Sequence, residues 1–332
     1  MPTIIVIGAS EGGVDAICSL ADALPAAFPA AIFVVLHIGG HRSQLPALLN
    51  VSGQMRAVHA KDGESIHTGR IYVAPPDYHM VIDREHIRLT RGPRENWARP
   101  AIDPLFRSAA QAYGADTIGV ILTGGLNDGT AGLFEIKRCG GTTVVQNPDD
   151  AANPSMPSSA LQHVEVDYCT ALNDLPGLLI SLVSEKAQAA QTDRLPMQRG
   201  ARSKEMTVDY TLENPVAVTC PDCGGALRRA ELGTLTQFRC HIGHIYTAEV
   251  MVTAQFAALE GSTAATMRSL SERGEVCRQM AGKFRDAGDI DIAEDWTAAM
   301  HEAKERAGIM RELLEKKWTH PEITKSLQPS RK

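Results

Sequence analysis

The sequence predicts an α/β protein: a doubly wound, mostly parallel sheet, followed by a small cysteine-rich module and an α-helical hairpin. Short apolar runs rich in β-branched residues recur along the first half of the chain, and segments with helical spacing separate them, which is typical of such a sheet. A polar, aperiodic stretch then precedes a cluster of cysteines and glycines, and two long helical patterns follow that cluster.

The predicted strands are continuous apolar runs, as expected of strands buried on both faces of a parallel sheet. The first run ends in glycine, and we expect a helix to follow Gly12 and Gly13. Asp103 and Pro104 predict another helix start, with aspartate as N-cap and proline at the first helical position. The predicted strands are 3–8, 31–36, 70–73, 117–122 and 142–146, and the predicted helices are 14–24, 104–113 and 131–139.

A chain of 332 residues is long enough for more than one domain. Ala287, Gly288 and Asp289 predict the turn between the two long helices, since they can end one helix and begin the next. We expect an α/β domain at 1–185, a linker at 186–214, a cysteine-rich module at 215–247, a helical hairpin at 248–318 and a basic tail at 319–332.

The composition of the chain argues against two classes of function, nucleic-acid binding and insertion into a membrane. The net charge is −6 and the basic residues are scattered, which argues against a nucleic-acid partner. No apolar run approaches the ~18 residues of a membrane span, and the N-terminus does not resemble a signal peptide, so we expect no membrane insertion. Seven cysteines, an odd number without a regular framework, fit a reducing compartment, and we expect a cytoplasmic protein.

Ser10 lies where the first predicted strand turns into a helix, in the segment GASEGG. The hydroxyl of a residue placed there projects beyond the carboxyl edge of the sheet, and the backbone N–H groups that follow, beginning with Glu11, can stabilise an oxyanion. This position predicts a nucleophile. A phosphate-binding loop and ordinary turn chemistry are the alternatives, although the segment lacks the G-x-G-x-x-G spacing of dinucleotide-binding folds.

A serine nucleophile needs a base, and His37 ends the second predicted strand, beside Ser10. A histidine that only caps its strand is the alternative, and His41, farther into the loop, is a weaker rival. Asp128 follows the strand at 117–122 in a glycine-rich turn, where it can orient His37 or cap the next helix. Backbone N–H groups near Gly125 would supply a second oxyanion donor.

Six segments, in this order and spacing, resemble the catalytic domain of the chemotaxis-type protein-glutamate methylesterases, the CheB family. They are GASEGG, VVLHIGGHRS, RIYVAPPDYHM, RGPRENWARPAIDPLFRSAA, ILTGGLNDGTAGLFEIKRCGGTTVVQNP and MPSSAL. The resemblance covers about residues 3–183. In that family the corresponding serine, histidine and aspartate form a catalytic triad, which implies the same roles for Ser10, His37 and Asp128.

The resemblance implies hydrolysis of γ-glutamyl methyl esters on a receptor, without a catalytic cofactor, and deamidation of glutamine as a second activity. A methyltransferase or a sensor kinase of the same pathway is implied as a further partner. Many members have threonine and methionine where this chain has Glu11 and Gly125. These positions adjoin the oxyanion hole, whose donors are backbone N–H groups, so the substitutions leave the hole possible and its exact shape and the substrate preference open. The typical enzyme also has an N-terminal receiver domain. Because the first strand begins at residue 3, we expect no control by phosphorylation within this chain.

Arg91, Arg94 and Arg99 lie in one predicted loop. They can line a groove for the acidic helices of a receptor, or they can belong to a solvated loop.

The cysteine-rich module carries a second candidate site. Cys220, Cys223, Cys240 and His244 have the paired short spacings of a zinc ribbon, and so small a module needs a metal to fold, so we expect one structural zinc. His241 is an alternative fourth ligand, and free thiols or a redox pair are the alternative to a metal.

Three functions follow from these observations. The first is a methylesterase of glutamyl esters, the second a hydrolase of another ester or an amide, and the third a non-catalytic signalling scaffold. Retention of all three triad residue types argues against the scaffold.

Overall fold

The computed structural model describes residues 2–37, 43–192 and 215–316. The chain forms two compact units, one that ends at Met251 and one that begins at Val252. The rival base His41, most of the predicted linker and the predicted basic tail lie outside the described residues.

A seven-stranded parallel sheet forms the centre of the first unit, in the order β3-β4-β2-β1-β7-β8-β9. The predicted sheet and its five strands are confirmed, and two short outer strands, β3 and β9, extend it. The strands are β1 (Ile4–Ala9), β2 (Ala31–Leu36), β3 (Arg56–His59), β4 (Arg70–Val73), β7 (Thr117–Ile121), β8 (Thr142–Gln146) and β9 (Tyr168–Thr170).

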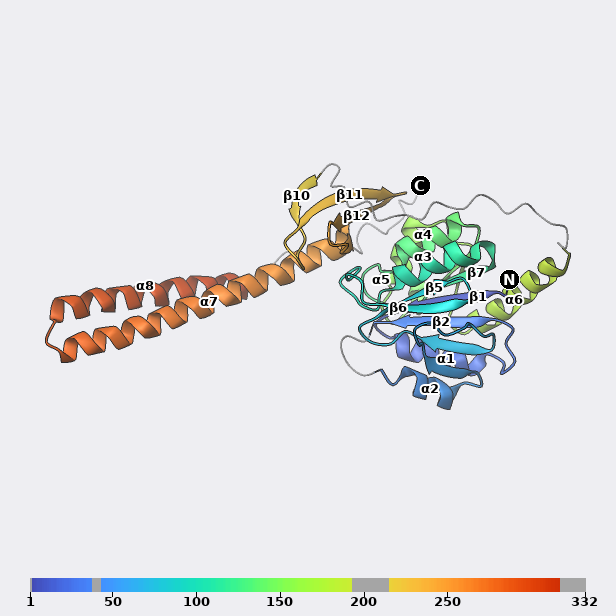
Figure 1. Ribbon diagram of the computed structural model, residues 1–332, viewed down its shortest axis with the longest axis horizontal. Coiled ribbons are helices and arrows are strands. Elements are labelled where there is room, and N and C mark those ends of the chain that lie inside the picture. Colours follow the sequence, from blue (N-terminus) through green and yellow to red (C-terminus); the bar gives the residue numbers. More distant parts are fainter. Residues whose placement is uncertain (1, 38–42, 193–214, 317–332) are drawn as a thin grey trace. The chain divides into compact units, whose positions relative to one another are not determined.

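Helices cover both faces of this sheet, as the doubly wound prediction requires (Figure 1). One apolar core lies under α1 (Gly13–Ala23), α2 (Leu45–Ser52) and α6 (Leu175–Thr192). The other lies under α3 (Ile102–Tyr113), α4 (Thr130–Arg138) and α5 (Ser155–His163). An antiparallel hairpin, β5 (His79–Asp83) and β6 (His86–Thr90), packs on this second core, and two short 3-10 turns span Gly114–Asp116 and Pro148–Asp150.

The start of α3 differs from the sequence prediction. The helix begins at Ile102, Ala101 is its N-cap, and Asp103 lies inside the first turn with no exposed surface. Its carboxylate accepts hydrogen bonds from Asn96 and from the N–H of Gly132, and so it does not cap the helix. Contacts with other elements therefore override the local capping preference of this aspartate.

The cysteine-rich segment forms a four-stranded antiparallel sheet that belongs to the first unit. Its strands are β10 (Pro215–Thr219), β11 (Ala226–Leu232), β12 (Leu235–Cys240) and β13 (Ile245–Thr247). We refer to residues 215–247 as the ribbon module.

The predicted helical hairpin is confirmed and consists of α7 (Ala248–Asp286) and α8 (Ile290–Glu315). The turn falls at Ala287, Gly288 and Asp289, as the sequence predicts. Within the second unit, Gly274 of α7 lies against Ala303 of α8, where a Cβ on the glycine would be 3.8 Å from the alanine Cβ. Among the described residues, no helix is both long and apolar enough to cross a membrane.

Candidate active site and metal centre

The sheet register brings Ser10 and His37 together at its carboxyl edge. Ala9 pairs with Leu36 across the parallel strands β1 and β2, and Ser10 and His37 are the next residues of each strand. The N–H of His37 donates to the carbonyl of Ala9 at 3.2 Å, which continues the strand pairing by one residue. Neighbouring strands lie about 4.8 Å apart, so the two side chains start from adjacent positions.

Asp128 reaches the same edge from the turn after β7, the other neighbour of β1. Its Oδ2 lies 2.8 Å from Nε2 of His37. The carboxylate is 2% exposed, and the imidazole is only partly exposed. Because Nε2 is engaged by the carboxylate, Nδ1 is the ring nitrogen that can act as base.

Five donors surround the Asp128 carboxylate. Besides His37, the N–H of Ile102 donates to Oδ2 at 2.6 Å, and the Asn96 amide donates to Oδ1 at 3.0 Å. The N–H groups of Asp103 and Gly129 complete the set at 3.3 and 3.0 Å. Burial by itself raises the pKa of Asp128, but the hydrogen bond and charge of His37 and the other donors hold that pKa below the usual carboxyl range. Asp128 is therefore ionised at neutral pH.

A second buried carboxyl, Asp103, lies beside Asp128. Burial, and then the negative charge of Asp128, raise the pKa of Asp103 well above its usual value. The Asn96 amide bridges the pair, since its Nδ2 donates to Asp103 at 2.9 Å and to Asp128 at 3.0 Å. One of the two carboxyls is thus ionised while its neighbour favours the neutral form.

The turn that carries Ser10 packs against the turn after β7. The N–H of Ser10 donates to the carbonyl of Thr123 at 3.0 Å, and the Thr123 hydroxyl donates to the carbonyl of Glu11 at 2.9 Å. A Cβ on Gly124 would lie 2.2 Å from Met156 Sδ and 2.9 Å from Ser10 Cβ, so only glycine fits there.

The two backbone N–H groups predicted to bind an oxyanion are free of other hydrogen bonds among the described residues. The backbone N–H groups of Glu11 and Gly125 donate to no acceptor within the described part of the chain. The Glu11 side chain accepts from Asn153 at 2.8 Å, and the Asn153 amide nitrogen would lie 3.5 Å from a Cβ on Gly125. The N–H groups of Glu11 and Gly125, on adjoining turns beside Ser10, are therefore available to an oxyanion, and their role in binding one stays a prediction.

The three loop arginines differ in their surroundings. Arg99 makes two contacts with Asp77, at 3.0 and 2.7 Å, and Arg91 pairs with the same carboxylate at 3.0 Å while it lies over the ring of Tyr78. Arg94 is exposed. Two of the three side chains therefore brace the loop through Asp77, and a role of any of them in a substrate groove stays a prediction.

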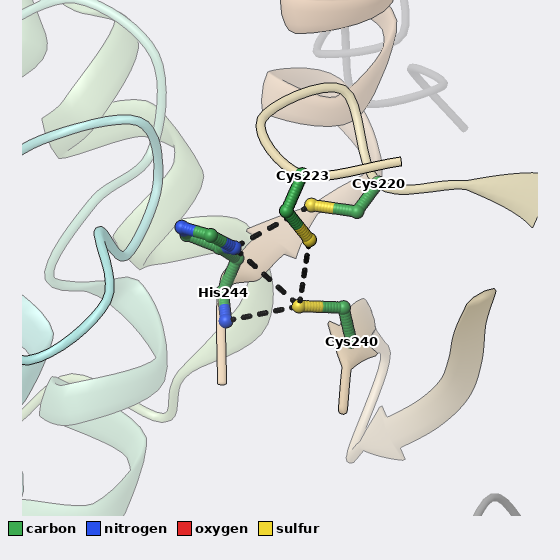
Figure 2. A group of neighbouring side chains, drawn as sticks. All are labelled: Cys220, Cys223, Cys240 and His244. Atoms are coloured by element: carbon green, nitrogen blue, oxygen red, sulfur yellow. Dashed lines mark hydrogen bonds between the residues drawn. The ribbon is translucent and has the colours of Figure 1, made fainter. Parts of the chain in front are cut away.

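In the ribbon module, the ligand atoms of Cys220, Cys223, Cys240 and His244 all lie within 4.8 Å of one another (Figure 2). Nδ1 of His244 is 3.6 Å from Cys220 Sγ and 3.4 Å from Cys240 Sγ, and the Cys223 and Cys240 sulfurs are 3.8 Å apart. Ligands at about 2.3 Å on tetrahedral corners stand about 3.8 Å apart, so these spacings fit zinc. His241 is exposed and outside this group.

The ribbon module also touches the candidate active site, through residues that the sequence interpretation missed. Oδ1 of Asn96 accepts a hydrogen bond from the N–H of Thr247 at 3.1 Å, and the Thr247 hydroxyl donates to Oδ1 of Asn127 at 2.7 Å. No local pattern marks an asparagine in a loop for such a role, because its partners lie up to 151 residues away along the chain.

A parallel α/β sheet that places a serine-containing turn at the same edge as a hydrogen-bonded histidine–aspartate pair is typical of hydrolytic enzymes. The chain belongs to the CheB methylesterase family, whose model matches residues 5–179. In fold it is similar to the crystal structure of the Thermotoga maritima CheB methylesterase catalytic domain. That match has a TM-score of 0.53 and 34% identity, and it covers 55% of this chain and 99% of that one.

Curated relatives agree with the family. A Chromohalobacter salexigens protein named protein-glutamate methylesterase/protein-glutamine glutaminase is 36% identical over 190 residues, which are 56% of this chain and 54% of that protein. A Leptospira interrogans protein, to which the same name is given provisionally, is 39% identical over 180 residues, 54% of this chain and 93% of that protein. The chain thus spans nearly all of one relative and about half of the other.

Proposed function

We propose that this protein hydrolyses γ-glutamyl methyl esters on chemoreceptor-type proteins, with Ser10 as nucleophile, His37 as general base and Asp128 as the residue that orients His37. The observation that carries the proposal is the 2.8 Å contact between His37 and a buried, ionised Asp128, at the end of the strand beside the Ser10 turn. Family membership supports the glutamyl ester as substrate.

In the first step Ser10 Oγ attacks the ester carbonyl while Nδ1 of His37 takes the hydroxyl proton. Asp128 stabilises the imidazolium, and the N–H groups of Glu11 and Gly125 bind the oxyanion. Collapse of this intermediate breaks the bond to methoxide, which takes the proton from His37 and leaves as methanol. Water, deprotonated by His37, then hydrolyses the glutamyl–serine ester and restores both residues.

The same residues support deamidation of glutamine. An amide carbonyl is attacked in the same way, and the protonated His37 supplies the proton that the leaving ammonia needs. The names of the relatives, which join the two activities, support this second reaction.

Methanol release tests the proposal. Purified protein should release methanol from a receptor fragment bearing methylated glutamates, and Ser10→Ala should abolish release without changing the circular dichroism spectrum. A matched control is Ser158→Ala, in α5, which changes a serine elsewhere in the same domain. Equal release by wild type and Ser10→Ala would rule out the proposed nucleophile.

For the ribbon module we propose one structural zinc ion, held by Cys220, Cys223, Cys240 and the Nδ1 of His244. Tyr246 supports this arrangement, since its hydroxyl donates to Asp222 at 2.7 Å while Nε2 of His244 lies 3.8 Å from the same carboxylate. Four protein ligands leave no open position, so the metal has a structural role and catalysis needs no cofactor.

The setting of the protein is part of the same proposal. The substrate requires a methyltransferase in the same pathway, which forms the ester that this protein removes. No disulfide joins the described cysteines, three of which are the proposed zinc ligands, and this supports residence in the cytoplasm.

A further inference from the structure

The last strand of the ribbon module, β13, pairs with the loop that carries Asn96. The N–H of Asn96 donates to the carbonyl of Ile245 at 2.7 Å, and Glu95 and Ile245 form a parallel bridge. The N–H of Thr247 then donates to Oδ1 of Asn96 at 3.1 Å. Both β13 residues follow the metal ligand His244 within three positions, so the metal site and this loop share one short segment.

This pairing fixes which way the Asn96 amide points. Because Oδ1 accepts from the backbone N–H of Thr247, the amide nitrogen must face the opposite side, where it donates to Asp103 and Asp128. Asn96 is 5% exposed, and it and Trp97 have φ values of 48° and 63°, in the left-handed region that non-glycine residues seldom occupy. A conformation of this kind persists only where the surroundings hold it.

Thr247 also acts on the residue before Asp128. Its hydroxyl donates to Oδ1 of Asn127 at 2.7 Å, and the Asn127 amide donates in turn to Glu249 at 2.7 Å. Thr247 has no exposed surface and Asn127 is 2% exposed, so water cannot replace this bond. One residue of the ribbon module therefore holds both the amide that donates to Asp128 and the backbone neighbour of Asp128.

We propose that the ribbon module is a positioning element of the active site. Metal binding by the cysteines and His244 orders β13; Thr247 then orients Asn96 and Asn127, and these keep the Asp128 carboxylate aligned with His37. The inference rests on the proposed roles of Ser10, His37 and Asp128. Thr247 is a positioning residue, because it reaches the reacting atoms only through Asn96, Asn127 and Asp128.

The test uses full-length protein and a fluorophosphonate probe, whose reaction with Ser10 reports nucleophile activation without any need for the natural substrate. Thr247→Val keeps the shape and the backbone N–H but removes the hydroxyl, and should slow labelling and lower kcat about tenfold with KM unchanged. Thr247→Ser restores the hydroxyl and should bring both rates back to within about twofold of wild type.

Thr236→Val is the matched control in the same module. It makes the same chemical change at a site where the hydroxyl donates to the exposed carboxylate of Glu231, at 2.8 Å, and it should label like wild type. Wild-type labelling by Thr247→Val, or a loss that Thr247→Ser does not restore, overturns the role of the Thr247 hydroxyl, which acts through Asn127. Thr247→Val keeps the N–H that orients Asn96, so removal of the metal tests that part of the proposal.

The metal arm compares zinc-loaded protein with chelator-treated protein. Removal of zinc should slow labelling at least as much as Thr247→Val, and should also remove the downfield NMR signal of the proton between His37 and Asp128. Full labelling of metal-free protein overturns the coupling.

These readouts separate the two proposals. Labelling that depends on Thr247 in a protein that releases no methanol supports positioning and contradicts the methylesterase. Methanol release that requires Ser10 but is unchanged by Thr247→Val and by removal of zinc supports the methylesterase and contradicts the positioning role of the ribbon module.

Discussion

Replacement of Asp128 by asparagine should nearly abolish catalysis while leaving the protein folded. All five groups around this carboxylate are donors, so the new amide nitrogen must face donors whichever way it turns. If it faces His37, the imidazole can compensate only by accepting at Nε2. Its proton then moves to Nδ1, and the nitrogen proposed to deprotonate Ser10 is no longer a base.

The magnitudes of the two effects differ. Loss of a base with the correct tautomer in a Ser-His-Asp triad lowers kcat about 10⁴-fold, or about 5.4 kcal/mol of transition-state stabilisation. The structural cost is smaller. The N–H of Ile102 loses its 2.6 Å acceptor, and a buried donor without an acceptor costs about 1–3 kcal/mol.

The assay measures methanol release and thermal unfolding on the same samples. Asp167→Asn is the matched control, because Asp167, like Asp128, accepts from a backbone N–H, that of Thr143 (and from the Thr143 hydroxyl), but at the amino end of β8. It should lose comparable stability and keep its kcat. If Asp128→Asn retains kcat within about tenfold of wild type, or if Asp167→Asn loses as much activity, Asp128 does not act by orienting His37.

Three further predictions concern the surroundings of the site. Burial and the charge of Asp128 raise the pKa of Asp103. The folded protein therefore keeps the Asp103 proton at pH values where the unfolded chain has released it. Stability against urea should fall as pH rises from the ordinary carboxyl range, about pH 4, toward neutrality. Asp103→Asn should weaken that fall, and an identical pH dependence would contradict the assignment. Gly124→Ala places a methyl group 2.2 Å from Met156 Sδ and should lower both thermal stability and the rate at which Ser10 is labelled. Gly177→Ala, in helix α6 with open space around it, should lower neither. Natively purified protein should contain about one zinc per chain by elemental analysis, and Cys223→Ser should reduce it, while the absence of metal from the wild type would remove the proposed site.

The central strands could be predicted because burial on both faces leaves a plain mark in the sequence. Each of the runs 3–8, 31–36 and 117–122 is almost wholly apolar, and each became a strand of the sheet. The outer strands β3 and β9 leave no such mark. They have four and three residues, they are partly exposed, and only pairing with a neighbour defines them.

The candidate site divides in the same way. Ser10, His37 and Asp128 could be proposed from sequence because each directly follows a recognisable strand or turn, and strand order alone brings such positions together. Asn96 and Thr247 could not, because their importance comes from contacts between segments 151 residues apart. The burial of Asp103 was missed for a related reason, since its local sequence predicts a helix cap and its actual partners are Asn96 and Gly132.

Fluorophosphonate labelling followed by peptide mapping tests whether Ser10 is an activated nucleophile. We expect a single adduct on the peptide that contains Ser10, and we expect it to be lost in both Ser10→Ala and His37→Ala. An adduct on another serine, or equal labelling of the Ser10→Ala protein, would contradict this role of Ser10.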